Sequence, residues 1–156
     1  MKYKIYCDMD GVLANFAFKF KQVAGLEPKE YIQTFGQDAF WQECDSVKFW
    51  SEMPYERTAQ MLWEYLHRKN ATLLTTPSPQ VTSRVGKIIW KARFLKGNPK
   101  IIFSSSKEDY ADSRSILIDD FKHNLNKWEL AGGIGVRCRN GNVSEVIEQI
   151  EQIINN

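Results

Sequence analysis

The segment IYCDMDG at residues 5–11 decides how the rest of the chain is interpreted. Three residues typical of a short buried strand run directly into Asp8 and Asp10, and Gly11 follows them. Short apolar strands that end in polar or glycine-rich loops are typical of parallel sheets, because helices cover both faces of such sheets. Gly11 also permits a backbone turn that a side chain would obstruct. We therefore interpret this segment as a first strand and a loop that carries two carboxylates.

Four further segments have the same form, at residues 72–74, 101–103, 116–118 and 134–138. Helical patterns separate several of these runs. Apolar residues recur at helical spacing in two stretches, at Val81, Val85, Ile88, Ile89 and Ala92, and at Val143, Val146, Ile147, Ile150 and Ile154. Strands that alternate with helices predict an α/β fold with a Rossmann-like, mostly parallel sheet.

Residues 15–69 do not fit simple alternation. This segment has a helical pattern and holds more than half of the aromatic residues of the chain. A connection of that length is too long for one crossover helix between neighbouring strands. We therefore predict a small helical cap at 15–69, inserted after the first strand of a core formed by 1–14 and 70–156.

The strand ends carry the chemistry. Ligands of open α/β sheets bind beyond the carboxyl ends of the strands, so polar residues that follow different strands are expected to converge. The residues concerned are Asp8, Asp10, Thr75, Lys107, Asp119 and Asp120. Taken singly, each has an ordinary interpretation as a turn, strand or surface residue. Their arrival in order, each at a strand end, favours a common site.

Each residue type at this site suits phosphoryl transfer. Asp8 can attack phosphorus as a nucleophile, and Asp10 can protonate the leaving oxygen and then accept a proton from water. Lys107 offers a compact positive charge for the phosphate, and Thr75 can donate a hydroxyl hydrogen bond to it. Several carboxylates that face a phosphate would repel it, so this interpretation requires a cation. Asp8 with one or both of Asp119 and Asp120 would supply the oxygen ligands that Mg²⁺ prefers.

Composition narrows the class of protein. The chain has 156 residues, 43% hydrophobic content and a formal net charge of +2. This balance predicts one domain and indicates neither nucleic acid nor a membrane as a partner. Three widely separated cysteines form no disulfide framework and no metal pair, so we expect a reducing, cytoplasmic location. The first apolar stretch is too short for a signal peptide, and no run is long enough to span a membrane.

The motifs resemble those of one family. DMDGVLA at 8–14, TTP at 75–77, Lys107 and LIDD at 117–120 are similar to the motifs of the haloacid dehalogenase (HAD) superfamily of phosphohydrolases, and most similar to its 5'(3')-deoxyribonucleotidases. Two departures from that pattern are present. Asn15 stands where Asp is usual, and Ser105-Ser106 precede Lys107 where Arg-Asp is usual. These departures concern substrate preference and leave the catalytic motifs intact.

The resemblance implies a role for each matched residue. Asp8 would be the nucleophile and Asp10 the general acid and base, while Thr75, Thr76 and Lys107 would bind phosphate. It also implies that Mg²⁺ is held by Asp8, the backbone carbonyl of Asp10 and the Asp119-Asp120 pair. In that family, aromatic residues of the cap help to hold the base. The corresponding residues here would be Phe16, Phe40, Trp41, Phe49 and Trp50.

Three functions remain open at this stage. The first is magnesium-dependent hydrolysis of (deoxy)nucleoside monophosphates through an aspartyl-phosphate. The second is a phosphatase or phosphomutase that acts on a sugar phosphate or another small phosphomonoester. The third is a non-enzymatic module that retains Mg²⁺ and binds nucleic-acid ends through Arg84, Lys87 and Lys91, which we otherwise interpret as a solvated helix face. The sequence leaves the oligomeric state open, and a homodimer is one possibility.

Overall fold

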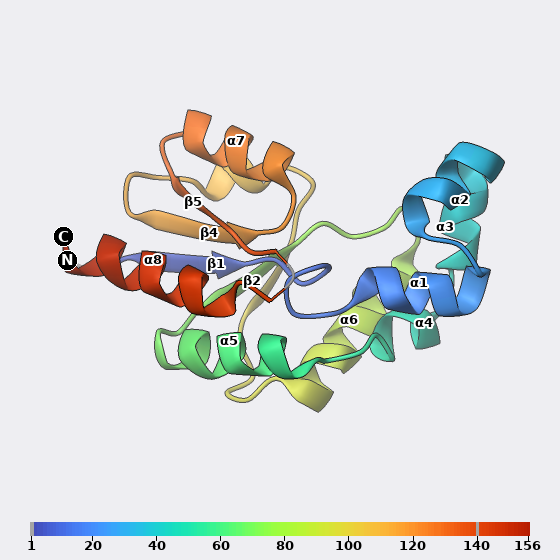
Figure 1. Cartoon of the computed structure of the whole chain (residues 1–156), viewed down its shortest axis with the longest axis horizontal. Coiled ribbons are helices and arrows are strands. Elements are labelled where there is room, and N and C mark those ends of the chain that lie inside the picture. Colours follow the sequence, from blue (N-terminus) through green and yellow to red (C-terminus); the bar gives the residue numbers. More distant parts are fainter. Residues whose placement is uncertain (1, 140) are drawn as a thin grey trace.

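The computed structural model of the chain describes residues 2–139 and 141–156. Its centre is a five-stranded sheet in which all neighbouring strands are parallel, in the order β3-β2-β1-β4-β5 (Figure 1). The strands are β1 Lys4–Cys7, β2 Thr72–Thr75, β3 Ile101–Phe103, β4 Ser115–Asp119 and β5 Ile134–Arg137. The predicted α/β fold with a parallel sheet is therefore confirmed. The strand order reverses at β1, which places the ends of β1 and β4 at the point where such sheets bind ligands.

Eight α-helices and one short 3₁₀ helix are present in the described residues. They are α1 Phe16–Ala24, α2 Pro28–Phe35, α3 Gln37–Glu43, α4 Val47–Ser51, α5 Arg57–Arg68, α6 Val81–Phe94, η1 Lys107–Tyr110, α7 Lys122–Leu130 and α8 Val143–Asn155. In this part of the chain, no helix is both long enough and apolar enough to cross a membrane.

Side chains of successive strand residues pack into two separate cores, because neighbouring residues of a strand point to opposite faces. Ile116 and Ile118 belong to the larger core, which includes buried residues of α5 and α8. Leu117 points the other way and packs with Leu125 and Trp128 of α7. The sheet is thus covered on both faces, as expected of a parallel sheet.

The helices of segment 15–69 fall into two groups (Figure 1). Helices α1–α4 lie beyond the carboxyl ends of the strands, where a cap would cover a site. Helix α5 instead runs beside the sheet and packs against α8, to which Tyr65 is tied by a hydrogen bond from its hydroxyl to Glu151 Oε1 at 2.7 Å. The last helix of the predicted cap segment therefore helps to form the larger core.

Helix α6 holds the cap to the core. Gly86 makes this possible, because a Cβ atom at that position would lie 2.4 Å from Trp50 Cβ and 2.7 Å from the carbonyl oxygen of Val47, both in α4. The indole of Trp90 donates a hydrogen bond to the carbonyl oxygen of Met53 at 2.8 Å. A small residue and a bonded indole on the same face of α6 thus let α4 approach closely.

The structure corrects the expected orientation of α6. Its apolar residues do recur at helical spacing, but they face outward, and Val81 is 69% exposed. The buried face consists of Ser83, Gly86, Lys87 and Trp90. The interpretation of Lys87 as part of a solvated basic face is therefore wrong, because its side chain is 0% exposed. Contact with α4 and with the strand ends decides which face is buried.

Candidate active site

The loop after β1 is held in one conformation by its own backbone. The N–H groups of Leu13 and Ala14 both donate to the carbonyl oxygen of Met9 at 2.9 Å. The N–H of Gly11 donates to the carbonyl oxygen of Ala14. Gly11 has a φ of +81°, in the left-handed region that glycine adopts most readily. A Cβ atom there would also lie 2.2 Å from Asp120 Oδ2. Gly11 therefore serves both the turn and the close approach of Asp120.

Asp8 and Asp119 are brought together by the pairing of β1 with β4. The backbone N–H of Asp8 donates to the carbonyl oxygen of Ile118 at 2.9 Å. Lys107, at the start of η1, reaches both carboxylates, with its Nζ 2.9 Å from Asp8 Oδ1 and 2.8 Å from Asp119 Oδ2. All three side chains are buried. The prediction that these residues converge is confirmed by these contacts.

Burial and mutual repulsion govern the protonation of this group. Burial raises the pKa of Asp8 well above its ordinary value; Lys107 opposes this shift, and Asp119 adds to it. For Lys107, burial acts to lower the pKa, but Asp8 and Asp119 outweigh burial and raise it. The pKa of Asp120 is raised to about 7, first by burial and then by Asp119. The Lys107 ammonium therefore stays charged. The negative charge of the neighbouring carboxylates exceeds what this one ammonium can neutralise.

The donor set fits a divalent cation. Asp8, Asp119 and Asp120 each offer a carboxylate oxygen, and these oxygens all lie within 4.8 Å of one another. These three carboxylates face the one ammonium of Lys107. The formal charge that remains is minus two, which one Mg²⁺ would neutralise. Hard oxygen ligands of this kind suit Mg²⁺.

Asp119 is oriented by neighbours that the sequence analysis did not single out. Its Oδ1 accepts a hydrogen bond from the backbone N–H of Phe121 at 2.9 Å, and its Oδ2 accepts one from Asn124 Nδ2 at 3.0 Å. Asn124 lies in the first turn of α7, five residues further along the chain. Bonds of this kind fix the direction of a ligating carboxylate.

Lys87 is the residue that the sequence analysis misjudged. Its Nζ lies 2.9 Å from Asp10 Oδ2, 2.8 Å from Thr75 Oγ1 and 2.9 Å from the carbonyl oxygen of Thr76. It also lies 5.1 Å from the centre of the Trp50 ring. One signal could have identified it. Ser83, Gly86 and Trp90 lie three or four positions from Lys87 or from one another, and residues at that spacing share one side of a helix.

Thr75 and Thr76 differ in their surroundings. Thr75 is buried at the end of β2, and its hydroxyl oxygen accepts the bond from Lys87. Thr76 is exposed, and its hydroxyl donates to the carbonyl oxygen of Ser104 at 3.1 Å. Thr76 therefore ties the loop after β2 to the loop after β3. Of the two hydroxyls, that of Thr75 is the one with a proton left to donate.

The five cap aromatics are brought together but are not equally available. Phe40, Phe49 and Trp50 keep only 4%, 3% and 1% of their surface exposed. Phe16 contacts all three of them, with ring centres 5.6–6.0 Å apart. Phe16 and Trp41 are only partly buried. The structure thus places Phe40, Phe49 and Trp50 in the interior of the cap and leaves Phe16 and Trp41 with accessible surface.

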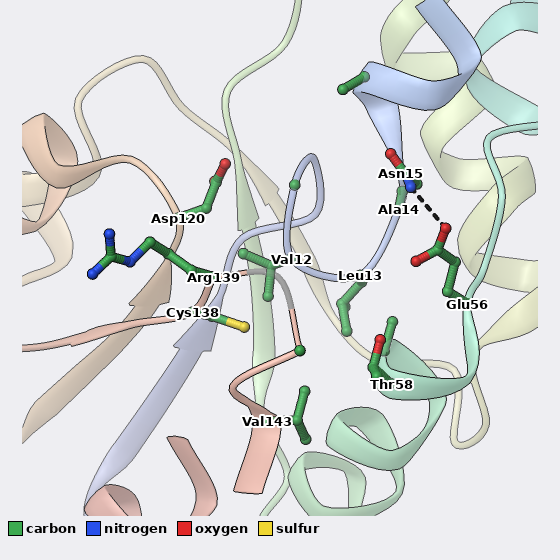
Figure 2. Close-up of a pocket in the computed structure, with 14 residues that line it drawn as sticks. Val12, Leu13, Ala14, Asn15, Glu56, Thr58, Asp120, Cys138, Arg139 and Val143 are labelled. Carbon is green, nitrogen blue, oxygen red and sulfur yellow. Dashed lines mark hydrogen bonds between the residues drawn. The ribbon is translucent and has the colours of Figure 1, made fainter. Parts of the chain in front are cut away.

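A pocket of about 700 Å³ adjoins Asp120 (Figure 2). Its walls come from the loop after β1, the start of α5 and the connection from β5 to α8. Asp120 and Arg139 lie on one side, and the amide of Asn15 donates to Glu56 Oε1 at 2.8 Å on another. The lining contains no aromatic residue and, of the proposed metal ligands, only Asp120. It is therefore a space with a mixed polar and apolar lining beside the predicted phosphate site.

Comparison with known proteins identifies the fold. No family model and no curated protein matches the sequence. A HAD-superfamily hydrolase from Ehrlichia chaffeensis is 16% identical, with a TM-score of 0.54 over 99% of this chain and 100% of that one. A haloacid dehalogenase-like family hydrolase from Streptococcus pneumoniae is 13% identical, with a TM-score of 0.57 over 97% and 98%. A HAD family hydrolase from Deinococcus radiodurans with bound phosphate and sodium is 12% identical, with a TM-score of 0.54 over 93% and 88%.

These likenesses define the class of fold. At such identities they show the architecture alone, and the architecture is HAD-like. The fold that the motif resemblance implied is therefore confirmed, and its assignment to a nucleotidase subfamily stays a prediction.

Proposed function

We propose that this chain is a magnesium-dependent phosphatase that hydrolyses phosphomonoesters through an aspartyl-phosphate on Asp8, with (deoxy)nucleoside monophosphates as its first substrate class. One observation carries the proposal. Lys107 bridges Asp8 and Asp119 at the carboxyl ends of β1 and β4, with Asp120 beside them. A nucleophile, a cation for the phosphate and a set of metal ligands are thus assembled at one point.

The residues of the chain divide the reaction into two displacements. A carboxylate oxygen of Asp8 attacks phosphorus, the bond from phosphorus to the leaving oxygen breaks, and Asp10 gives that oxygen a proton. A water molecule then attacks the phosphorus of the aspartyl-phosphate. Asp10 takes the proton of this water, and the bond between phosphorus and Asp8 breaks. Inorganic phosphate and free Asp8 result, so Asp10 ends in its starting state.

Charge at the phosphate is balanced by neighbouring donors. Lys107 presents a charge-assisted donor to the phosphate oxygens, and Thr75 presents its hydroxyl proton. Asp8, Asp119 and Asp120 would hold Mg²⁺, which would offset the negative charge of the phosphate and of the carboxylates. The HAD family hydrolase from Deinococcus radiodurans, which contains phosphate and sodium, supports a site for an anion and a cation in this fold.

The nucleotide preference rests on the cap. Phe16 and Trp41 have accessible aromatic surface, and stacking on a base would use it. The carbonyl oxygen of Trp41 accepts a hydrogen bond from Gln80 at 3.4 Å, which ties this part of the cap to the loop after β2. Since Phe40, Phe49 and Trp50 are buried, we assign base contact to Phe16 and Trp41 alone.

A sugar phosphate is the second candidate substrate class. The pocket beside Asp120 has no aromatic lining, and Asn15, Glu56, Thr58 and Arg139 supply polar groups there. Such a surface would bind hydroxyl groups of a sugar by hydrogen bonds. A binding module for nucleic-acid ends is less well supported, since Lys87 is buried and Lys91 is bonded to Asn98 at 2.8 Å.

Phosphate release from a substrate panel tests the proposal. The panel contains 5'- and 3'-nucleoside monophosphates and sugar phosphates, each with magnesium or EDTA. We expect magnesium-dependent release that is lost in Asp8→Asn and retained in Asp38→Asn, a matched change at an exposed cap carboxylate. Release that continues unchanged in Asp8→Asn would contradict the mechanism, and folded protein that releases nothing from any substrate would contradict the function.

A cap variant tests the substrate class separately. Trp41→Ala should lower kcat/KM for nucleotides by about tenfold, because stacking of a base on an aromatic side chain is worth about 1–3 kcal/mol. Sugar phosphates should lose little. An equal loss on both classes would count against base contact while leaving the phosphatase mechanism intact.

A further inference from the structure

Lys87 is a buried ammonium whose donors are all assigned. A lysine ammonium has three N–H groups, and Lys87 has three oxygen partners within 2.9 Å. Its side chain is 0% exposed, and the Trp50 ring of the cap lies over it. A buried charge is tolerated only where it is paired and hydrogen-bonded. The position of this ammonium is therefore fixed by Asp10, Thr75 and the backbone of Thr76.

The contact with Lys87 gives the two carboxyl oxygens of Asp10 different hydrogen-bonding environments. Oδ2 is held by Lys87 at 2.9 Å, whereas Oδ1 is buried and has no hydrogen-bond partner among the described residues. A buried acceptor without a partner destabilises the fold, so such atoms in native proteins call for an explanation. A carboxyl group with one oxygen held in place and the other free is suited to transfer a proton to a bound substrate.

The same ammonium orients Thr75. Because Thr75 Oγ1 accepts from Lys87 at 2.8 Å, its own hydroxyl proton must point elsewhere. Thr75 ends β2 and Asp10 follows β1, and the Lys87 side chain joins them. One residue of α6 thus sets the direction of both a proton carrier and a phosphate donor.

We infer that Lys87 is a positioning residue for Asp10: it holds Oδ2, so that Oδ1 is the atom that gives a proton to the leaving oxygen and later takes one from the attacking water. This inference rests on the proposed phosphatase function. Lys87 acts through Asp10 and Thr75 and forms no bond to the reacting atoms. Its removal should therefore impair proton transfer more than attack by Asp8.

Leaving groups of different basicity separate these two effects. A nitrophenolate leaves without a proton, whereas the alkoxide of an alkyl phosphate needs one. The comparison uses kcat/KM, which reports the steps up to departure of the leaving group and not the later attack of water, which both substrates share. Lys87→Met should lower kcat/KM by about a hundredfold on an alkyl phosphate such as a 5'-nucleoside monophosphate, the usual contribution of a positioned acid. On p-nitrophenyl phosphate the loss in kcat/KM should stay below about tenfold, the part that does not involve the proton.

Two controls define the result. Asp10→Asn should give the same dependence on the leaving group, and the double variant should lose no more than Asp10→Asn alone, since both changes remove one function. Lys91 lies one turn further along α6, where its ammonium is bonded to Asn98 and Pro99, and Lys91→Met should match the wild type.

Thermal unfolding of each variant reports whether it folds. If Lys87→Met does not fold, Lys87→Gln retains N–H donors and should show a smaller loss of the same kind.

The outcomes that contradict the inference are distinct. Equal losses on both substrates would mean that Lys87 supports phosphate binding or the fold, and no loss would mean that it has no part in the reaction. Additive losses in the double variant would separate Lys87 from Asp10. A wild-type protein that hydrolyses neither substrate would contradict the proposed function itself.

Discussion

Lys107 Nζ lies 2.9 Å from Asp8 Oδ1, so a cation from the segment after β3 contacts the proposed nucleophile directly. Asp8 and Lys107 are 99 positions apart in the chain, and only the pairing of the strands brings them together. The same ammonium reaches Asp119 at 2.8 Å. Both the catalytic rate and the stability of the fold therefore depend on the Lys107 side chain, and its removal should lower both.

Replacement of this ammonium is the first prediction. Lys107→Met should lower kcat/KM by about 10²–10³-fold, the usual effect of removing one charged donor from a transition state. It should also destabilise the fold by about 3 kcal/mol, because Asp119 is left buried without its cation. Lys127→Met is the matched control, since Lys127 pairs with Glu108 at the surface. Full activity in folded Lys107→Met protein would contradict the role of Lys107.

Magnesium should stabilise the folded protein through the same carboxylates. A ligand that binds only the folded state adds about 2.7 kcal/mol at a concentration of one hundred times its Kd. We expect Mg²⁺ to raise the Tm of the wild type and EDTA to reverse the rise. In Asp119→Asn the rise should be lost, and in Asp112→Asn, which changes an exposed carboxylate bonded to Lys4, it should remain. A rise of equal size in Asp119→Asn would place the metal elsewhere.

The close contact between α4 and α6 predicts that one added methyl group at Gly86 lowers the stability of the fold. Gly86→Ala would bring a Cβ atom to 2.4 Å from Trp50 Cβ, so α4 must move. Overpacking of this kind costs about 1–3 kcal/mol, although Ala in an open helical position would stabilise by about 1 kcal/mol. Denaturant unfolding should therefore show net destabilisation, whereas Val85→Ala on the exposed face should change little. Stabilisation by Gly86→Ala would mean that α4 does not pack as described.

The three thiols should be unreactive in the folded protein. Burial raises the pKa of Cys44 to about 12 and, together with Asp120, that of Cys138 to about 11; burial also raises the pKa of Cys7. The thiolate is the reactive form, so a raised pKa lowers the reactive fraction at any pH below it. A thiol reagent at pH 8 should label none of them until denaturant is added, and all three thereafter. Rapid labelling of Cys138 in native protein would show that the pocket admits the reagent to its sulfur.

The sequence sufficed to predict the architecture and the convergence of the strand ends. Apolar runs followed by polar residues identified the carboxyl ends of four strands, and a parallel sheet brings those ends to one edge. Asp8, Lys107 and Asp119 accordingly lie in direct contact. This part of the site follows from topology alone, since it needs no knowledge of how helices pack.

The role of Lys87 could not be predicted in the same way. Periodicity shows that a helix has two faces, but the partner decides which of them is buried. Here the apolar residues of α6 face solvent, while Gly86 and Lys87 face the cap and the strand ends. The cap aromatics illustrate the same limit. The motif resemblance suggested Phe49 and Trp50 as base-pocket residues, and only the packing shows that both side chains are buried.

The central claim is that Asp8 becomes phosphorylated during turnover, and its most direct test is to trap that species. Protein mixed with magnesium and a phosphomonoester substrate is quenched in acid during steady turnover, digested and analysed by mass spectrometry. The account predicts that the peptide containing Asp8 gains the mass of one phosphoryl group, and that Asp8→Asn gains none. Rapid turnover with no phosphorylated peptide, or a phosphoryl group on a different residue, would contradict it.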